Sequence, residues 1–188
     1  MRNVVLNTFG VEAFGTLAEG YFNGAKQLLQ QFEASNGPDF DIYPIIFLFR
    51  HAVELSLKDV VGVMQVLAAF LGTGPTRFET PRGHDLDALI RILDEQWGLI
   101  KATIGTEEEP LDHEARQAIA DLDAADKASE AFRYPVNRSG QPFFEEHHVL
   151  GYGRLADTME HVHHQFSGVM GFLYDREQIA EDMRSESY

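Results

Sequence analysis

The chain of 188 residues carries 30 acidic and 15 basic residues, and its net charge of −15 argues against a broad surface for nucleic acid or anionic membrane. It contains no cysteine, so disulfides and thiolate metal sites are excluded and a reducing, cytoplasmic location is expected. Hydrophobic residues make up 44% of the chain, enough for one domain with a substantial core, and no apolar run is long enough for a membrane span.

Three helices are predicted in the first 100 residues. The first is expected over residues 11–32, where apolar side chains recur near the helical period, and a Gly-Pro pair after it stops the helix. The second is expected from Pro44, a residue favoured in a first turn, to Leu71, just before a glycine-rich break. A third helix is expected over residues 85–100, with Asp85 as its cap or first-turn acid.

Two more helices are predicted after residue 110. One is expected over residues 111–132, and the following loop, 133–142, contains prolines and a glycine that indicate a structured turn or a short hairpin. The last is expected over residues 146–174, and the charged segment after it is typical of a fraying tail. The sequence therefore predicts an all-α, up-and-down bundle of about five helices, as one domain over residues 1–175 with a tail over 176–188.

The most informative segment lies in the second predicted helix, where Arg50, Glu54 and Lys58 follow one another at intervals of four. Side chains four apart in a helix lie on one face, so both neighbouring pairs can form ion pairs. The surrounding residues are apolar nearly all round, which is typical of a buried helix. The charged stripe must therefore be paired internally or used by a ligand.

Three short segments together resemble HEPN-type helical proteins. They are the FRHAVELSLK sequence of residues 49–58, the GHDL sequence that opens the third predicted helix, and the FRYP sequence of residues 132–135. The resemblance implies an up-and-down helical bundle, frequent homodimers and a connection to RNA or nucleotides, often as ribonucleases of toxin–antitoxin and anti-phage systems.

The ribonuclease signature of that family is an arginine, usually followed by a polar residue, with a histidine a few residues further on. Arg77 with His84 and Arg154 with His161 have a suitable spacing, but the residue after each arginine is apolar, which departs from the pattern. The sequence therefore assigns no catalytic residue.

A set of polar residues remains as the candidate phosphate- or RNA-binding site or, alternatively, as a polar core. Its members are Arg50, His51, Glu54, Lys58, His84, Arg133 and Arg138. In the functional interpretation, a histidine moves the proton of an RNA 2′-hydroxyl and an arginine stabilises the charge on phosphorus. In the structural interpretation, the stripe is a buried ion-pair network to which Arg133 or His84 clamps a loop.

The last predicted helix is rich in histidine. His161 and His164 are three apart and are weak candidates for metal ligands on one helix face, although no complete metalloprotease-type motif is present. No metal or other cofactor is predicted.

Three functions follow as hypotheses. The first is a HEPN-like bacterial protein that binds RNA or a nucleotide phosphate, with ribonuclease activity left open and a homodimer expected. The second is a non-catalytic interaction module whose acidic surface meets a basic protein partner, and the third is a metal-dependent enzyme built on the last-helix histidines.

Overall fold

The computed structural model describes residues 14–35, 37–74, 83–144 and 151–185. The protein is all-α, with five α-helices packed together and no strand in the described ranges. The elements are α1 (Phe14–Ser35), the short 3-10 helix η2 (Asp39–Asp41), α2 (Ile42–Phe70), α3 (Leu86–Ile104), α4 (His113–Ala125) and α5 (Tyr152–Ser185). Within these ranges no helix is long and apolar enough to cross a membrane.

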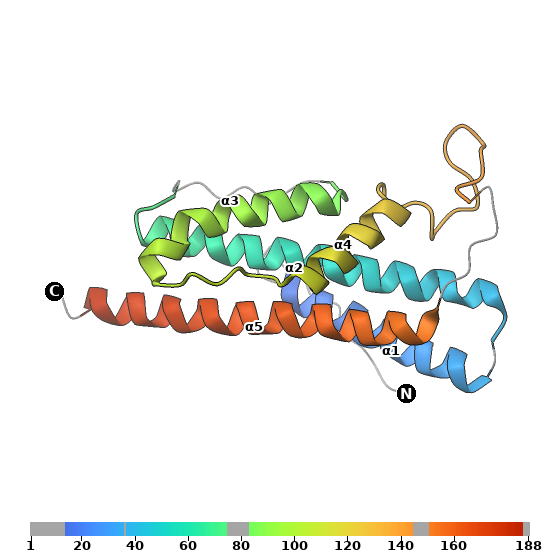
Figure 1. The fold of residues 1–188 in the computed structure, drawn as a ribbon, viewed down its shortest axis with the longest axis horizontal. Coiled ribbons are helices and arrows are strands. Elements are labelled where there is room, and N and C mark those ends of the chain that lie inside the picture. The colour runs from blue at the N-terminus through green and yellow to red at the C-terminus, as the bar shows by residue number, and fades with distance from the viewer. Residues whose placement is uncertain (1–13, 36, 75–82, 145–150, 186–188) are drawn as a thin grey trace, which may run out of the picture.

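Helix α2 runs through the middle of the molecule, with α3 on one side and α1 and α5 on the other (Figure 1). Its apolar residues extend round the helix, and this pattern explains the central position, because every face has a neighbour to pack against. Fully buried α2 side chains include Phe49, Leu57, Val61, Met64 and Leu67. Burying an apolar side chain of this size contributes about 1.5–3 kcal/mol, so α2 anchors the core.

The ends of α3 and α4 are defined by local hydrogen bonds. The Asp85 carboxylate accepts from the backbone N–H of Ala88 at 2.9 Å, which confirms the predicted cap of α3. Asp112 caps α4 in the same way, accepting from the Ala115 N–H at 2.8 Å. Helix α3 ends at Ile104 and is followed by Gly105, whose φ of 72° is a left-handed conformation that glycine adopts without strain.

The prediction that the fourth helix continues to Phe132 is wrong, because α4 ends at Ala125. The Asp126 carboxylate accepts hydrogen bonds from the backbone N–H groups of Glu130 and Ala131, which folds the chain into a turn. Within this turn Ser129 has a φ of 57°, which a continuing helix does not permit. Side-chain bonding therefore overrides an apolar spacing that resembled a longer helix.

Helix α5 begins at Tyr152 and continues to Ser185, well past the predicted end at residue 174. The residues after 174 include good helix formers, so the helix continues without needing an apolar face. The predicted starts of the first and last helices, at residues 11 and 146, lie outside the described residues, and the division into domain and tail stays a prediction.

The loop of residues 133–142 stands out from the bundle (Figure 1). A single antiparallel bridge joins Val136 and Pro142, and the Asn137 N–H donates to the Gln141 carbonyl at 2.8 Å. The structured turn expected from the prolines and glycine is present, although it forms one bridge and no strand.

Candidate functional site

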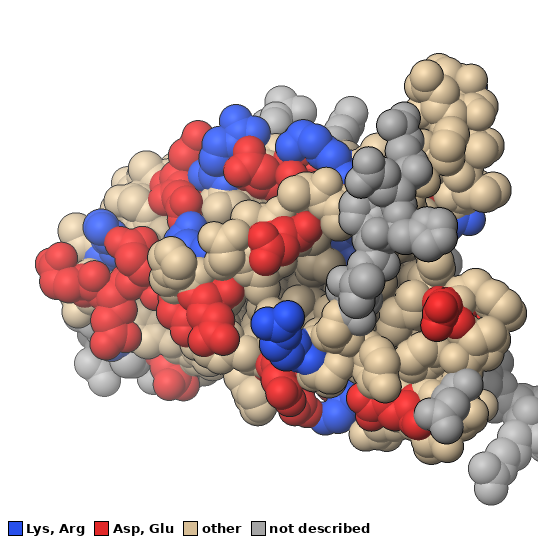
Figure 2. All heavy atoms as spheres, turned by 45° about the vertical axis from the view of Figure 1, so that its right-hand side comes forward, with Lys and Arg blue, Asp and Glu red and all other residues tan. Residues whose placement is uncertain are grey.

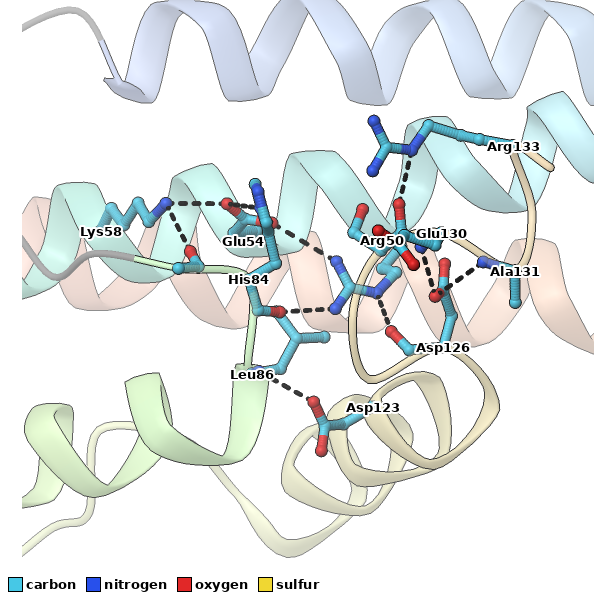
Figure 3. A network of polar contacts seen from close by, with 12 residues as sticks. Arg50, Glu54, Lys58, His84, Leu86, Asp123, Asp126, Glu130, Ala131 and Arg133 are labelled. Atoms are coloured by element: carbon cyan, nitrogen blue, oxygen red, sulfur yellow. Dashed lines mark hydrogen bonds and ion pairs between the residues drawn. The ribbon is translucent and has the colours of Figure 1, made fainter. Parts of the chain in front are cut away.

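The Glu54 carboxylate is the centre of a polar network between α2 and the segment that leads into α3 (Figure 3). Its side chain is only 1% exposed. It accepts from Lys58 Nζ at 2.7 Å, lies 3.0 Å from Nδ1 of His84, and lies 3.4 Å from Nη1 of Arg50. The structure therefore brings together the predicted stripe and His84, which lies 30 residues after Glu54 in the sequence.

Glu54 is held in its ionised form. Burial disfavours the charge and acts to raise the pKa, but the hydrogen bonds from Lys58 and His84 outweigh burial and bring the pKa of Glu54 below its usual value. The network therefore contains a permanent buried carboxylate that orients the groups around it.

Arg50 belongs to the core. Its side chain is 0% exposed, and beside Glu54 its guanidinium donates to two backbone carbonyls: Nε to Asp126 at 2.8 Å and Nη2 to His84 at 2.5 Å. Arg50 thus ties the loop before α3 and the turn after α4 to α2, and a ligand cannot reach its guanidinium.

Two aspartates that the sequence analysis did not single out support the same junction. Asp126 holds the turn after α4 through the N–H groups of Glu130 and Ala131, at 2.7 and 3.0 Å. Asp123 accepts from the backbone N–H of Leu86 at 2.9 Å, which connects the end of α4 to the start of α3. Both aspartates are buried, but in an acidic sequence they resemble ordinary surface residues, and only the three-residue spacing between them hinted at a shared face.

His84 forms the exposed end of the network. Its side chain is 53% exposed, and in Figure 3 its ring lies above Glu54 with Nδ1 against the carboxylate. When Nδ1–H donates to Glu54, the opposite nitrogen Nε2 carries the lone pair of the neutral ring. Lys58 fixes the neighbouring backbone by donating to the Gly83 carbonyl at 3.1 Å.

His51 directly follows Arg50 on α2 and lies in an aromatic setting. Its ring meets the edge of Tyr21 at a centroid distance of 4.5 Å and stacks on Phe47 at 5.8 Å. Burial lowers the pKa of His51; nearby Glu54 opposes this shift, whereas the surrounding cationic groups add to it. His51 is therefore a neutral imidazole near neutral pH.

Arg133 approaches the same aromatic group from the loop after α4. Its guanidinium lies over the Phe47 ring at 5.3 Å and over the Tyr134 ring at 5.5 Å, and its Nε donates to the Ser129 carbonyl. Figure 3 shows the terminal nitrogens of Arg133 pointing away from the buried network, on the side of α2 toward which the His84 ring also projects.

Arg138 lies apart from these residues. Its side chain is 91% exposed and pairs with Glu130 at 3.0 Å. The structure therefore leaves Arg138 on the protruding loop and not with the other candidates.

The candidate residues thus divide into two groups. We call Arg50, Glu54 and Asp126 the inner network, because all three are buried and bonded within the protein. We call His51, Lys58, His84 and Arg133 the outer face, because they surround the same stretch of α2 and are at least partly exposed.

The surface charge around the bundle is mixed. On the face shown in Figure 2, acidic and basic side chains are interspersed and form no continuous basic region. This distribution agrees with the net charge of −15, and any phosphate contact must be local, not a broad electrostatic one.

The last-helix histidines form no metal site with the residues described here. No group of three or more metal-ligating side chains occurs in the described ranges, and His161 Nε2 lies 2.9 Å from the Asp112 carboxylate. Of the two arginines with signature spacing, Arg154 is exposed on α5 and Arg77 lies outside the described residues.

A scan against protein-family models, a search of curated proteins and a search of solved structures each give no match.

Proposed function

We propose that the protein is a HEPN-like, up-and-down helical protein that binds RNA or a nucleotide phosphate on the outer face. One observation carries the proposal: the buried Glu54 carboxylate holds Nδ1 of the exposed His84 at 3.0 Å. A buried acid that orients an exposed imidazole leaves Nε2 available to a ligand, as acid–base chemistry requires.

The dyad suits proton transfer from RNA. His84 Nε2 accepts the proton of a 2′-hydroxyl, the 2′-oxygen bonds to phosphorus, and the bond from phosphorus to the 5′-oxygen breaks as that oxygen takes a proton from water. The hydroxide left behind takes the proton of the imidazolium, which restores neutral His84 and water. Glu54 stabilises the imidazolium that forms, since it is ionised. Ribonuclease activity is the catalytic extension of the binding proposal.

Arg133 supplies the complementary positive charge. Its guanidinium is supported by two aromatic rings and by the bond from Nε to Ser129, so its orientation is partly fixed before a ligand arrives. A planar guanidinium donates two parallel hydrogen bonds to a phosphate, whereas an ammonium acts as a single point of charge. The outer face therefore pairs an acid–base group with a phosphate-binding group.

The test is retention and degradation of total RNA at low ionic strength, measured for wild type, His84→Ala and Arg133→Ala. Arg138→Ala is the matched control, because Arg138 is an arginine on the same loop that takes no part in the outer face. We expect wild type and Arg138→Ala to retain RNA equally and the other two variants to retain less RNA, all with unchanged circular dichroism. Cleavage is supported if His84→Ala no longer degrades RNA whereas Arg133→Ala only binds RNA more weakly.

Equal behaviour of all four proteins would contradict the proposal. If wild type neither retains nor degrades RNA, the second hypothesis gains, namely a non-catalytic interaction module. The three hydrogen bonds that Arg50 donates within the protein favour a structural role for the inner network. The expected homodimer is checked separately by light scattering of wild type.

A further inference from the structure

A hollow lies between α5 and the segment that joins α3 to α4. Its volume is about 310 Å³, near the lower end of small-ligand sites. The residues that matter for its chemistry are Trp97, Glu108, Glu109, Gly168 and Phe172. None of them belongs to the outer face.

The floor of the hollow is aromatic and well anchored. The rings of Trp97 and Phe172 lie 6.1 Å apart at an angle of 52°. Trp97 Nε1 donates to the Glu108 carbonyl at 3.0 Å, which fixes the joining segment against α3. The electron-rich faces of such rings attract cations.

A carboxylate at the rim is available to a ligand. Glu109 is engaged with Lys101 at 3.6 Å, whereas Glu108 has no ion pair among the described residues. The Glu108 backbone is held from both sides, since its N–H donates to the Thr106 hydroxyl and its carbonyl accepts from Trp97. The fold therefore fixes the backbone of Glu108 beside the hollow, and its side chain is exposed to solvent.

An arginine of the protein itself already packs against one of these aromatic rings. The guanidinium of Arg176, one turn further along α5, lies 4.9 Å from the centre of the Phe172 ring. Arg176 is not one of the residues that line the hollow, so the space beside the ring stays open. A second guanidinium in the hollow would contact the partly exposed Phe172 beside the 4%-exposed Trp97, and Glu108 and Glu109 also line that space.

We propose that this hollow binds an arginine side chain from a basic segment of a partner protein. The volume suits one long side chain, the rings attract its charge, and the planar guanidinium pairs with a carboxylate through two hydrogen bonds. A net charge of −15 draws a basic partner toward the protein. This site is independent of the outer face and of its proposed function.

The fluorescence of Trp97 can report on binding in the hollow, because Trp97 is the single tryptophan of the chain. Tryptophan fluorescence is followed while a short peptide with two arginines is added. The matched peptide contains citrulline, which keeps the shape of arginine without its charge. We expect a saturable change with the arginine peptide and none with the citrulline peptide.

Substitution at a glycine blocks the hollow without disturbing the core. A Cβ atom at Gly168, which lines the hollow, meets nothing within 4 Å, and the same holds at Gly171, which does not line it. Gly168→Leu should abolish the fluorescence response, whereas Gly171→Leu should leave it unchanged. Glu108→Gln should weaken binding about fivefold, and Glu107→Gln should have no effect.

Three results would each overturn the proposal: no saturable response in wild type, equal responses to the arginine and citrulline peptides, or equal binding by Gly168→Leu and Gly171→Leu. Free spermidine is added as a further probe. Saturation by spermidine at the same concentration as the arginine peptide would overturn the assignment to an arginine side chain in favour of a small polyamine.

Discussion

The two ends of the polar network around Glu54 differ in what surrounds them, although one carboxylate serves both. At the inner end, Arg50 is fully buried and donates to Glu54 and to two backbone carbonyls. At the outer end, His84 uses one ring nitrogen on Glu54 and exposes more than half of its side chain. The same network therefore contains a buried, structural end and an end that is exposed to solvent.

This contrast shows why charge spacing alone does not identify a binding residue. Arg50 and Lys58 are each four residues from Glu54, yet only the packing of the α3 and α4 segments over Arg50 makes it inaccessible. An arginine whose donors are occupied by carbonyls stabilises the fold and cannot bind phosphate.

The largest expected effect is from Arg50→Met. The substitution removes three donated hydrogen bonds, so the His84 carbonyl loses its guanidinium donor and Glu54 loses one of its cationic partners. The Asp126 carbonyl keeps its bond from the Ser129 N–H. The free energy of unfolding should fall by about 4 kcal/mol. Urea unfolding followed by circular dichroism measures the change. Arg138→Met, at an exposed arginine, is the control and should change stability by less than about 0.5 kcal/mol. Similar stability of the two variants would contradict the structural role of Arg50.

A smaller loss is expected from Glu54→Gln, which keeps the side-chain shape but leaves Arg50 without its counter-charge. We expect a loss of about 3 kcal/mol. In the double variant with Arg50→Met, the combined loss should be less than the sum of the single losses by about 1–3 kcal/mol, because each single change leaves an unpaired group. Additive losses would indicate that the two residues act independently.

The pH dependence of the free energy of unfolding tests the contribution of His51, which lies beside the polar network. Burial lowers the pKa of His51 below 6.5 in the folded protein, so in acid the unfolded chain binds a proton that the folded chain does not. The free energy of unfolding should therefore fall as the pH drops from about 7.5 to about 5.5. In His51→Phe, which keeps an aromatic ring between Tyr21 and Phe47, this part of the fall should disappear. An identical slope in both proteins would show that His51 does not contribute.

The smallest effect on stability is expected at the outer end. His84→Ala removes one bond to Glu54 from a half-exposed ring, while Lys58 and Arg50 still balance the carboxylate. The loss should stay below about 1 kcal/mol. A loss as large as that of Arg50→Met would place His84 in the structural network and remove the contrast.

Much of the fold could be predicted from periodicity. The central helix, the stripe at intervals of four and the Asp85 cap are local features, since each depends on residues within one turn of one another. These features also predicted that Arg50, Glu54 and Lys58 would have to be paired or used.

The remainder depends on contacts between distant segments. Arg50 Nε bonds to the carbonyl of Asp126, which lies 76 residues away, and that contact accompanies the early end of α4. The placement of Arg133 over Phe47 arises from the same turn. No local pattern distinguishes such residues from surface charges, so the division of the candidates into inner network and outer face required the structure.

The central claim is that the exposed nitrogen of His84 meets a phosphate-bearing ligand while the inner network stays structural. The most direct measurement is a nuclear magnetic resonance titration in which a short single-stranded oligoribonucleotide is added and the ring resonances of the histidines are followed. The His84 resonance is assigned from its absence in the His84→Gln variant. We predict a saturable shift of the His84 resonance and none for His161 on α5. A titration in which His84 does not move, or moves no more than His161, would contradict the claim.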